Sequence, residues 1–261
     1  MAKTAWRIGA GVAVILILLL SQEIRDLAKA VGSPIPPLPI PYGGSGLDNL
    51  LAVLIVAAGA WLLLRRPAGL ARDLGLRFNG WRGPVLAAVA TLPFWIGVVW
   101  LGKPATDWSA LDLVMLAFAF PLAEEIVFRG FGFVLTRRAL GWPMGLAIAV
   151  QALGFGAIHW MGAGGDTAGL QIFAITALGA VLFAVVDAID GYTIWSGFVI
   201  HVSMNAVWVV CTPPDSMGTG WVGNALRLAT AALALFLFWR FGRRGNAADV
   251  SVSTEPTPAL H

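Results

Sequence analysis

The sequence is poor in the residues that cross-link or charge a soluble domain. It contains one cysteine, Cys211, so an intramolecular disulfide framework is excluded, and a single thiol does not build a thiolate metal site. Charged residues make up 12% of the 261 positions, whereas hydrophobic residues make up 58%. A soluble globular domain carries about twice that share of charge. The composition therefore predicts a polytopic membrane protein.

The small excess of positive charge has no single location. The net charge is +3, but the basic residues are dispersed between apolar segments rather than gathered in one patch. We therefore expect the lipid bilayer, and no nucleic acid, as the partner of these residues.

Eight apolar segments approach or exceed the length of roughly 20 residues that a helix needs to cross a bilayer. The first follows Lys3 and Arg7 as a signal peptide would, but no small-residue cleavage site follows it, so it is interpreted as a span. The fold class expected is all-α, with about eight transmembrane helices at residues 5–21, 47–64, 84–102, 110–136, 143–160, 168–190, 192–210 and 222–240.

The basic residues between these spans predict the orientation, because cytoplasmic loops carry an excess of Lys and Arg. With the N-terminus inside, external segments hold only Arg25, Lys29 and Lys103. The cytoplasmic segments hold twelve basic residues, namely Lys3, Arg7, Arg65, Arg66, Arg72, Arg77, Arg82, Arg137, Arg138, Arg240, Arg243 and Arg244. Both termini are thus predicted to be cytoplasmic.

The segments outside the spans differ in composition. Residues 33–46, SPIPPLPIPYGGSG, favour an extended external segment, either a connector or a lid. Residues 69–83 alternate Leu and Phe with Arg, which fits an interfacial helix or an ordinary cytoplasmic loop. Residues 245–261 form a polar tail that we expect to be disordered. Residues 1–244 are interpreted as one transmembrane domain.

Three charges interrupt the fourth span in PLAEEIVFRG. An ionisable residue inside a span costs a few kcal/mol, so it indicates a functional site when a partner can be named. On a helix Glu125 and Arg129 are neighbours at i and i+4 and can form an ion pair. Glu124 points elsewhere, and its own i+4 neighbour is Phe128, which carries no charge. Glu124 is therefore predicted to be the proton-exchanging residue, with Glu125 and Arg129 supporting it.

Polar residues on two other spans can meet these carboxylates. The sequence has three histidines, and two of them, His159 and His201, lie inside apolar spans. Asn205 follows His201 by four residues, so both can face one cavity. From the helical rise, Glu124, His159, His201 and Asn205 fall within about two turns of one level.

This set of groups matches amide hydrolysis. A carboxylate and an imidazole can deprotonate a water, while an imidazole and a carboxamide can donate to the oxyanion that forms on the carbonyl. A second interpretation is a divalent metal site, such as zinc, held by Glu124, His159 and His201. The sequence leaves both open.

The same residues resemble a known family, the CPBP intramembrane proteases, which include the type II CAAX prenyl endopeptidases and the bacterial Abi proteins. The family pattern is a glutamate pair followed by Phe-Arg, then Phe-x-x-x-His, then His-x-x-x-Asn on separate helices. Here these motifs, from about residue 110 to 210, are formed by Glu124, Glu125, Phe128, Arg129, Phe155, His159, His201 and Asn205.

The resemblance implies an intramembrane endopeptidase acting near the cytoplasmic side on a membrane-associated or lipidated substrate. It implies that Glu124 and His159 activate water and that His201 and Asn205 stabilise the oxyanion, and it leaves metal-dependent and glutamate-type catalysis open. The composition is compatible with a bacterial plasma membrane. The alternative is a non-catalytic protein, either a peptide-binding immunity or scaffold protein or a proton relay that also uses Asp187 and Asp190.

Overall fold

The chain folds almost entirely into helices, which make up 75% of the structure. This computed structural model describes residues 2–65, 69–167, 169–214, 218 and 220–242, so the tail expected to be disordered lies outside the described residues. The first half contains α1 (Ala2–Leu20), α2 (Ile24–Ala30), α3 (Gly43–Leu64), α4 (Leu70–Asp73), α5 (Arg82–Ala90), α6 (Leu92–Leu101) and β1 (Lys103–Pro104). The second half contains α7 (Ala110–Asp112), η1 (Leu113–Ala119), α8 (Phe120–Glu124), η2 (Glu125–Leu135), α9 (Thr136–Arg138), α10 (Met144–Gly162), α11 (Gly169–Ile189), α12 (Trp195–Val210), β2 (Cys211–Thr212) and α13 (Trp221–Phe241).

Helices occupy every range that hydropathy predicted. Among the described residues, five helical segments are long and apolar enough to cross a membrane: Gly43–Leu64, Arg82–Leu101, Met144–Gly162, Gly169–Ile189 and Trp221–Phe241. Two shorter apolar helices, Gly9–Leu20 and Trp195–Val210, accompany them. The prediction of a nearly all-α integral membrane protein is therefore confirmed.

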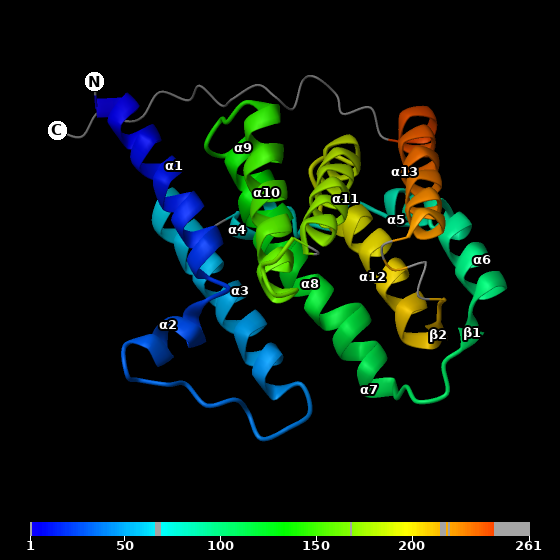
Figure 1. Ribbon diagram of the computed structural model, residues 1–261. Helices are drawn as coiled ribbons and strands as arrows, with labels where there is room; N and C mark the ends of the chain where they lie inside the picture. Colours follow the sequence, from blue (N-terminus) through cyan, green and yellow to red (C-terminus); the bar gives the residue numbers. More distant parts are fainter. Residues whose placement is uncertain (1, 66–68, 168, 215–217, 219, 243–261) are drawn as a thin grey trace.

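The helices are arranged as a bundle whose two ends differ (Figure 1). The start of α1 and the end of α13 lie at the same end of the bundle. The opposite end carries α2, α7 and the small antiparallel sheet, in which Lys103 pairs with Thr212 and Pro104 with Cys211. This sheet ties the end of α6 to the end of α12.

The connecting segments differ in part from the prediction. Residues 33–42 are non-helical, as the prolines indicate, but the glycine-rich end of the expected loop forms the first turn of α3, and α2 was not anticipated. Of the two interpretations of residues 69–83, a continuous interfacial helix does not form. Only α4 forms there, because Gly75 and Gly80 adopt positive φ angles that interrupt a right-handed helix.

The helix of the third predicted span is broken between α5 and α6. Pro93 has no N–H to continue the backbone hydrogen bonding, and the break falls at Thr91. The Thr91 hydroxyl donates to the Ala88 carbonyl at 2.8 Å and lies 2.7 Å from the Ser203 hydroxyl of α12, to which Trp95 Nε1 also donates. At this break the chain therefore forms a polar contact with α12 through Thr91, Trp95 and Ser203.

The fourth predicted span is a continuous helical rod from Ala110 to Arg138 with unusual hydrogen bonding. In η1 and η2 the backbone bonds in the wider π-helical register, as where the Phe120 N–H donates to the Met115 carbonyl five residues earlier. In that register the partner of the Leu116 carbonyl is the N–H of residue 121. Residue 121 is proline, which has no N–H, so this carbonyl depends on a partner from another helix.

The helix η2 lies at the centre of the bundle. Glu125 and all residues from Val127 to Leu135 are buried, so no side of the helix is left facing lipid. Val127, Phe128 and Phe131 pack with buried residues of α1, α3 and α10 in one core cluster. Two of the charges that interrupt this span, Glu125 and Arg129, are therefore enclosed by other helices rather than exposed to the bilayer.

Candidate active site

Glu125 is the fully buried centre of the site. Its side chain has 0% exposure, and its two oxygens face different partners: Oε2 lies 3.1 Å from Arg129 Nε and Oε1 lies 2.8 Å from His201 Nδ1. The first partner is on the same helix at i+4, and the second comes from α12. Glu125 thus links the central helix to the histidine of another span.

Arg129 is enclosed by one carboxylate and two aromatic rings. Its side chain has 0% exposure, and its Cζ lies 4.3 Å from the centre of the Phe155 ring and 4.9 Å from that of Phe183. Within the described part of the chain its guanidinium nitrogens have no aligned hydrogen-bond acceptor. The charge is therefore balanced by the close Glu125 carboxylate and by the negative faces of the rings.

Glu124 is the more accessible of the two glutamates. Its side chain is 21% exposed, and Oε2 lies 3.6 Å from His201 Nε2. The expectation that Glu124 lacks a charged neighbour is therefore wrong, because that inference considered its own helix alone. The two glutamates contact opposite nitrogens of one imidazole.

The contacts of His201 restrict its protonation states. Because the Glu125 carboxylate accepts a hydrogen bond, Nδ1 must carry a hydrogen. The remaining nitrogen, Nε2, faces Glu124.

His159 contacts the ring of Phe155, which also lies near the His201 ring. Its Nδ1 donates to the Phe155 carbonyl at 2.9 Å, one turn earlier on α10, so in the neutral ring Nε2 is free to accept. The Phe155 ring lies 4.3 Å from the His159 ring and 6.1 Å from the His201 ring, between centres. Phe128 packs edge-on against the same ring at 5.1 Å. The two histidines therefore share one aromatic neighbour.

Asn205 donates a hydrogen bond to the Leu116 carbonyl, which Pro121 leaves without a backbone N–H. Its Nδ2 donates to the Leu116 carbonyl at 3.1 Å, although the two residues are 89 positions apart. This carbonyl is the one left without an N–H by Pro121. One amide hydrogen of Asn205 is thereby used in a structural contact, and the second remains for another acceptor.

The metal interpretation is not supported by the grouping of the side chains. Across the described residues, no three or more His, Cys, Asp or Glu side chains are grouped so that they could hold a metal ion. Glu124, His159 and His201 are thus not grouped as three metal ligands among the described residues, although the bond of His201 Nδ1 to Glu125 leaves Nε2 able to bind a metal. We derive no catalytic step from a metal.

Two residues of α11 belong to the site: Phe183 was not predicted, and Asp187 was named only for the alternative proton relay. Phe183 covers Arg129 and lies 5.5 Å from the His201 ring, and Asp187, one turn later, is buried beside them. The signal available in the sequence was the i, i+4 spacing of an aromatic and an acid within an apolar span.

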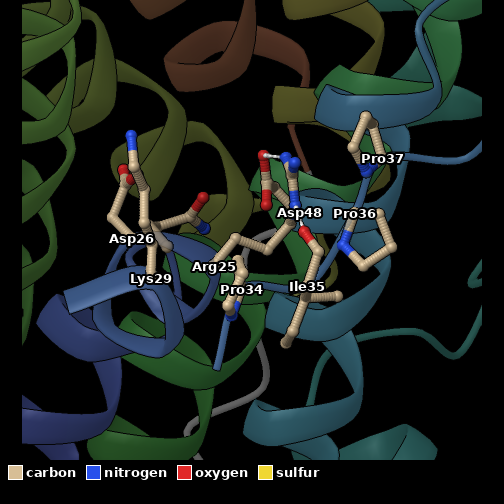
Figure 2. Close-up of a pocket in the computed structure, with 9 residues that line it drawn as sticks. Arg25, Asp26, Lys29, Pro34, Ile35, Pro36, Pro37 and Asp48 are labelled. Atoms are coloured by element: carbon tan, nitrogen blue, oxygen red, sulfur yellow. Dashed lines mark hydrogen bonds and ion pairs between the residues drawn. The ribbon is translucent and has the colours of Figure 1, made fainter. Parts of the chain in front are cut away.

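A surface pocket lies away from these residues. It is formed by Gln22 in the turn after α1, by α2, by residues 34–37 and by Asp48 near the start of α3, and has a volume of about 350 Å³. Figure 2 shows Arg25 paired with Asp48 there, at 3.0 Å, beside the wall of prolines. The site residues Glu124, His159, His201 and Asn205 are not among its lining residues.

The fold and the site together define a helical membrane protein with a buried carboxylate and imidazole centre. Residues 106–207 match the family of Rce1-like type II CAAX prenyl endopeptidases, which are hydrolases acting on peptide bonds. The match confirms the resemblance seen in the motifs, and it spans Glu124, His159, His201 and Asn205. No curated protein and no solved structure matches the chain.

Proposed function

We propose that the chain is an intramembrane endopeptidase that hydrolyses a peptide bond of a membrane-associated or lipidated substrate. The observation that carries this proposal is the difference in burial and in contacts between the two glutamates. Glu125 is fully buried and held by Arg129 and His201, whereas Glu124 is partly exposed and faces His201 Nε2 at 3.6 Å. Of the two glutamates, Glu124 is the one whose carboxylate is accessible to a water and a carbonyl group.

In the proposed reaction Glu124 accepts a proton from a water as that water attacks the carbonyl carbon. His159 assists by accepting a hydrogen bond at its free Nε2 and so orients the water. The tetrahedral intermediate collapses when the carbon–nitrogen bond breaks. The proton held by Glu124 passes to the departing amine, which leaves a carboxylic acid and an amine as products.

Charge on the carbonyl oxygen is stabilised by donors on α12. His201 in its doubly protonated form presents Nε2–H, and its orientation is fixed by Glu125 at Nδ1. Asn205 is anchored at the Leu116 carbonyl and offers its second amide hydrogen. Donors held in place before the reaction need no reorganisation as charge develops, which is the usual origin of oxyanion stabilisation.

We further propose the membrane arrangement of this enzyme. Eight crossings with both termini in the cytoplasm agree with the excess of Lys and Arg in the predicted inner loops. The start of α1 and the end of α13 lie at one end of the bundle, as an even number of crossings requires. Residues 1–244 would then form one transmembrane domain with its catalytic core at about 110–210, in a bacterial plasma membrane.

The test compares the purified wild type with Glu124→Gln on a panel of membrane peptides and prenylated peptides. We expect the substitution to lower kcat by about 10²–10⁴-fold, the range for loss of a general base, without lowering thermal stability. Glu23→Gln, at the start of α2, is the matched control because it makes the same chemical change outside the site. Equal cleavage by wild type and Glu124→Gln would contradict the proposal and favour a binding protein or a proton relay.

A further inference from the structure

The first turn of α12 is held by two acids from the end of α11. The Gly197 N–H donates to Asp187 Oδ1 at 2.8 Å, and the Ser196 hydroxyl donates to Asp190 Oδ2 at 2.7 Å. Backbone N–H groups in the first turn of a helix have no partner within the helix. Carboxylates at this end also interact favourably with the helix dipole. Asp187 and Asp190 therefore stabilise the start of the helix that carries His201.

Asp187 lies on the side of α11 that faces the site. Phe183, one turn earlier on the same helix face, lies 4.9 Å from Arg129 and 5.5 Å from the His201 ring. Asp187 has 0% exposure and interacts electrostatically with Glu125 and Arg129. Its Oδ2 accepts no hydrogen bond from the described residues. One oxygen of this carboxylate thus bonds to α12, while the other is an unpaired polar atom near the buried ion pair.

Gly197, whose N–H donates to Asp187, is packed closely against α11. A Cβ atom added at Gly197 would lie 3.0 Å from Asp187 Oδ2 and 3.1 Å from Phe183 Cβ. His201 follows Gly197 by four residues and so lies above it on the same face of α12. The distance from α11 to the first turn of α12 therefore determines where the imidazole meets Glu125.

We propose that Asp187 is a positioning residue for His201. By holding the Gly197 N–H it fixes the height and rotation of α12, so that His201 Nδ1 meets Glu125 and Nε2 faces Glu124. The expected effect on catalysis rests on the proposed peptidase function, whereas the expected effect on the imidazole does not.

A purely structural cap predicts a different behaviour. If Asp187 only satisfied a helix end, its loss would lower stability and leave the folded fraction with a normal site. Positioning instead predicts that the folded protein keeps its affinity for substrate and loses turnover. A misplacement of about 1 Å can cost about 10²-fold in rate.

Two substitutions at Asp187 separate the hydrogen bond from the charge. Asp187→Ala removes the acceptor, whereas Asp187→Asn keeps an oxygen that can accept from the Gly197 N–H. A third variant, Gly197→Ala, keeps the Asp187 carboxylate but crowds it and Phe183, so that α11 and the first turn of α12 must shift relative to each other, and Gly179→Ala is its matched control because a Cβ there meets nothing within 4 Å. Gly197→Ala provides the test if Asp187→Ala does not fold.

The measurements are kcat, KM and the ¹⁵N imidazole spectrum of histidine-labelled protein in detergent, where three histidines allow assignment by substitution. We expect Asp187→Ala and Gly197→Ala to lower kcat by about 10²-fold at unchanged KM and to shift the His201 Nδ1 signal, and Asp187→Asn to restore both. An unchanged His201 signal and kcat in folded Gly197→Ala or Asp187→Ala would overturn the proposal. If the wild type cleaves nothing, the peptidase proposal fails, and the His201 signal alone decides the positioning role.

Discussion

Glu125 and His201 are 76 positions apart in the chain and are joined by a hydrogen bond of 2.8 Å between Oε1 and Nδ1. This contact fixes one nitrogen of the imidazole and directs the other to Glu124. Arg129 lies against the second oxygen of Glu125. Both oxygens of Glu125 therefore have partners, and this carboxylate cannot take the place of Glu124. The order of the two glutamates in the sequence therefore determines which of them is buried and which is partly exposed.

Replacing Arg129 by methionine should destabilise the protein strongly. The substitution keeps an apolar stem between Phe155 and Phe183 but leaves the buried Glu125 carboxylate without its cation. Removal of one partner of a buried pair costs about 3–5 kcal/mol. Thermal unfolding in detergent measures the effect.

The control for this substitution is Arg25→Met. Arg25 pairs with Asp48 at 3.0 Å, but the two side chains are 22% and 33% exposed, and such pairs contribute about 0–1 kcal/mol. Equal melting temperatures for Arg129→Met and Arg25→Met would contradict the assignment of Arg129 as the compensating charge.

The contribution of Asn205 to stability should depend on Pro121. Asn205→Ala removes the side-chain donor to the Leu116 carbonyl and should cost about 1 kcal/mol. Pro121→Ala restores a backbone N–H at the position that reaches this carbonyl. In the Pro121→Ala background the cost of Asn205→Ala should therefore nearly disappear.

A double-mutant cycle on thermal stability measures this coupling. A cost of Asn205→Ala that is the same in both backgrounds would show that the carbonyl is satisfied in another way. Turnover gives a separate readout, because only the oxyanion role predicts that kcat stays low in the double variant.

Treatment with a chelator should leave cleavage unchanged. Glu124, His159 and His201 are not grouped as metal ligands in the described part of the chain, and the proposed reaction uses carboxylate and imidazole groups alone. The measurement is kcat before and after dialysis against a chelator. Loss of activity that zinc restores would favour the alternative three-ligand site instead.

The long helices could be predicted from the sequence because each depends on local hydropathy. Apolar runs and their flanking basic residues indicated every long helix, and the ion pair of Glu125 with Arg129 followed from i, i+4 spacing. Composition alone did not decide between a helix and a loop over residues 69–83, because it does not report the positive φ angles at Gly75 and Gly80.

The arrangement of the site could be predicted only in part, because its contacts join different helices. The motifs named Glu124 and His201, but the 3.6 Å between them depends on how α12 packs against the central rod. The sequence also did not reveal the contact of Asn205 with Leu116, which requires the π-helical register to be known. Asp187 was noticed as a charge, but its hydrogen bond to Gly197 is a tertiary contact.

The spacing of partners along the chain also orders the biogenesis of the site. A chain emerges from the ribosome at about 5–20 residues per second, so His201 follows Glu125 by several seconds. During that interval the charged span must enter the bilayer without α12. Arg129, only four residues from Glu125, is available at once and neutralises the carboxylate within its own helix. The Leu116 carbonyl is bonded instead by Asn205, which lies 89 residues later in the chain. The late synthesis of α12 therefore completes both the hydrogen bonding of the central helical rod and the site.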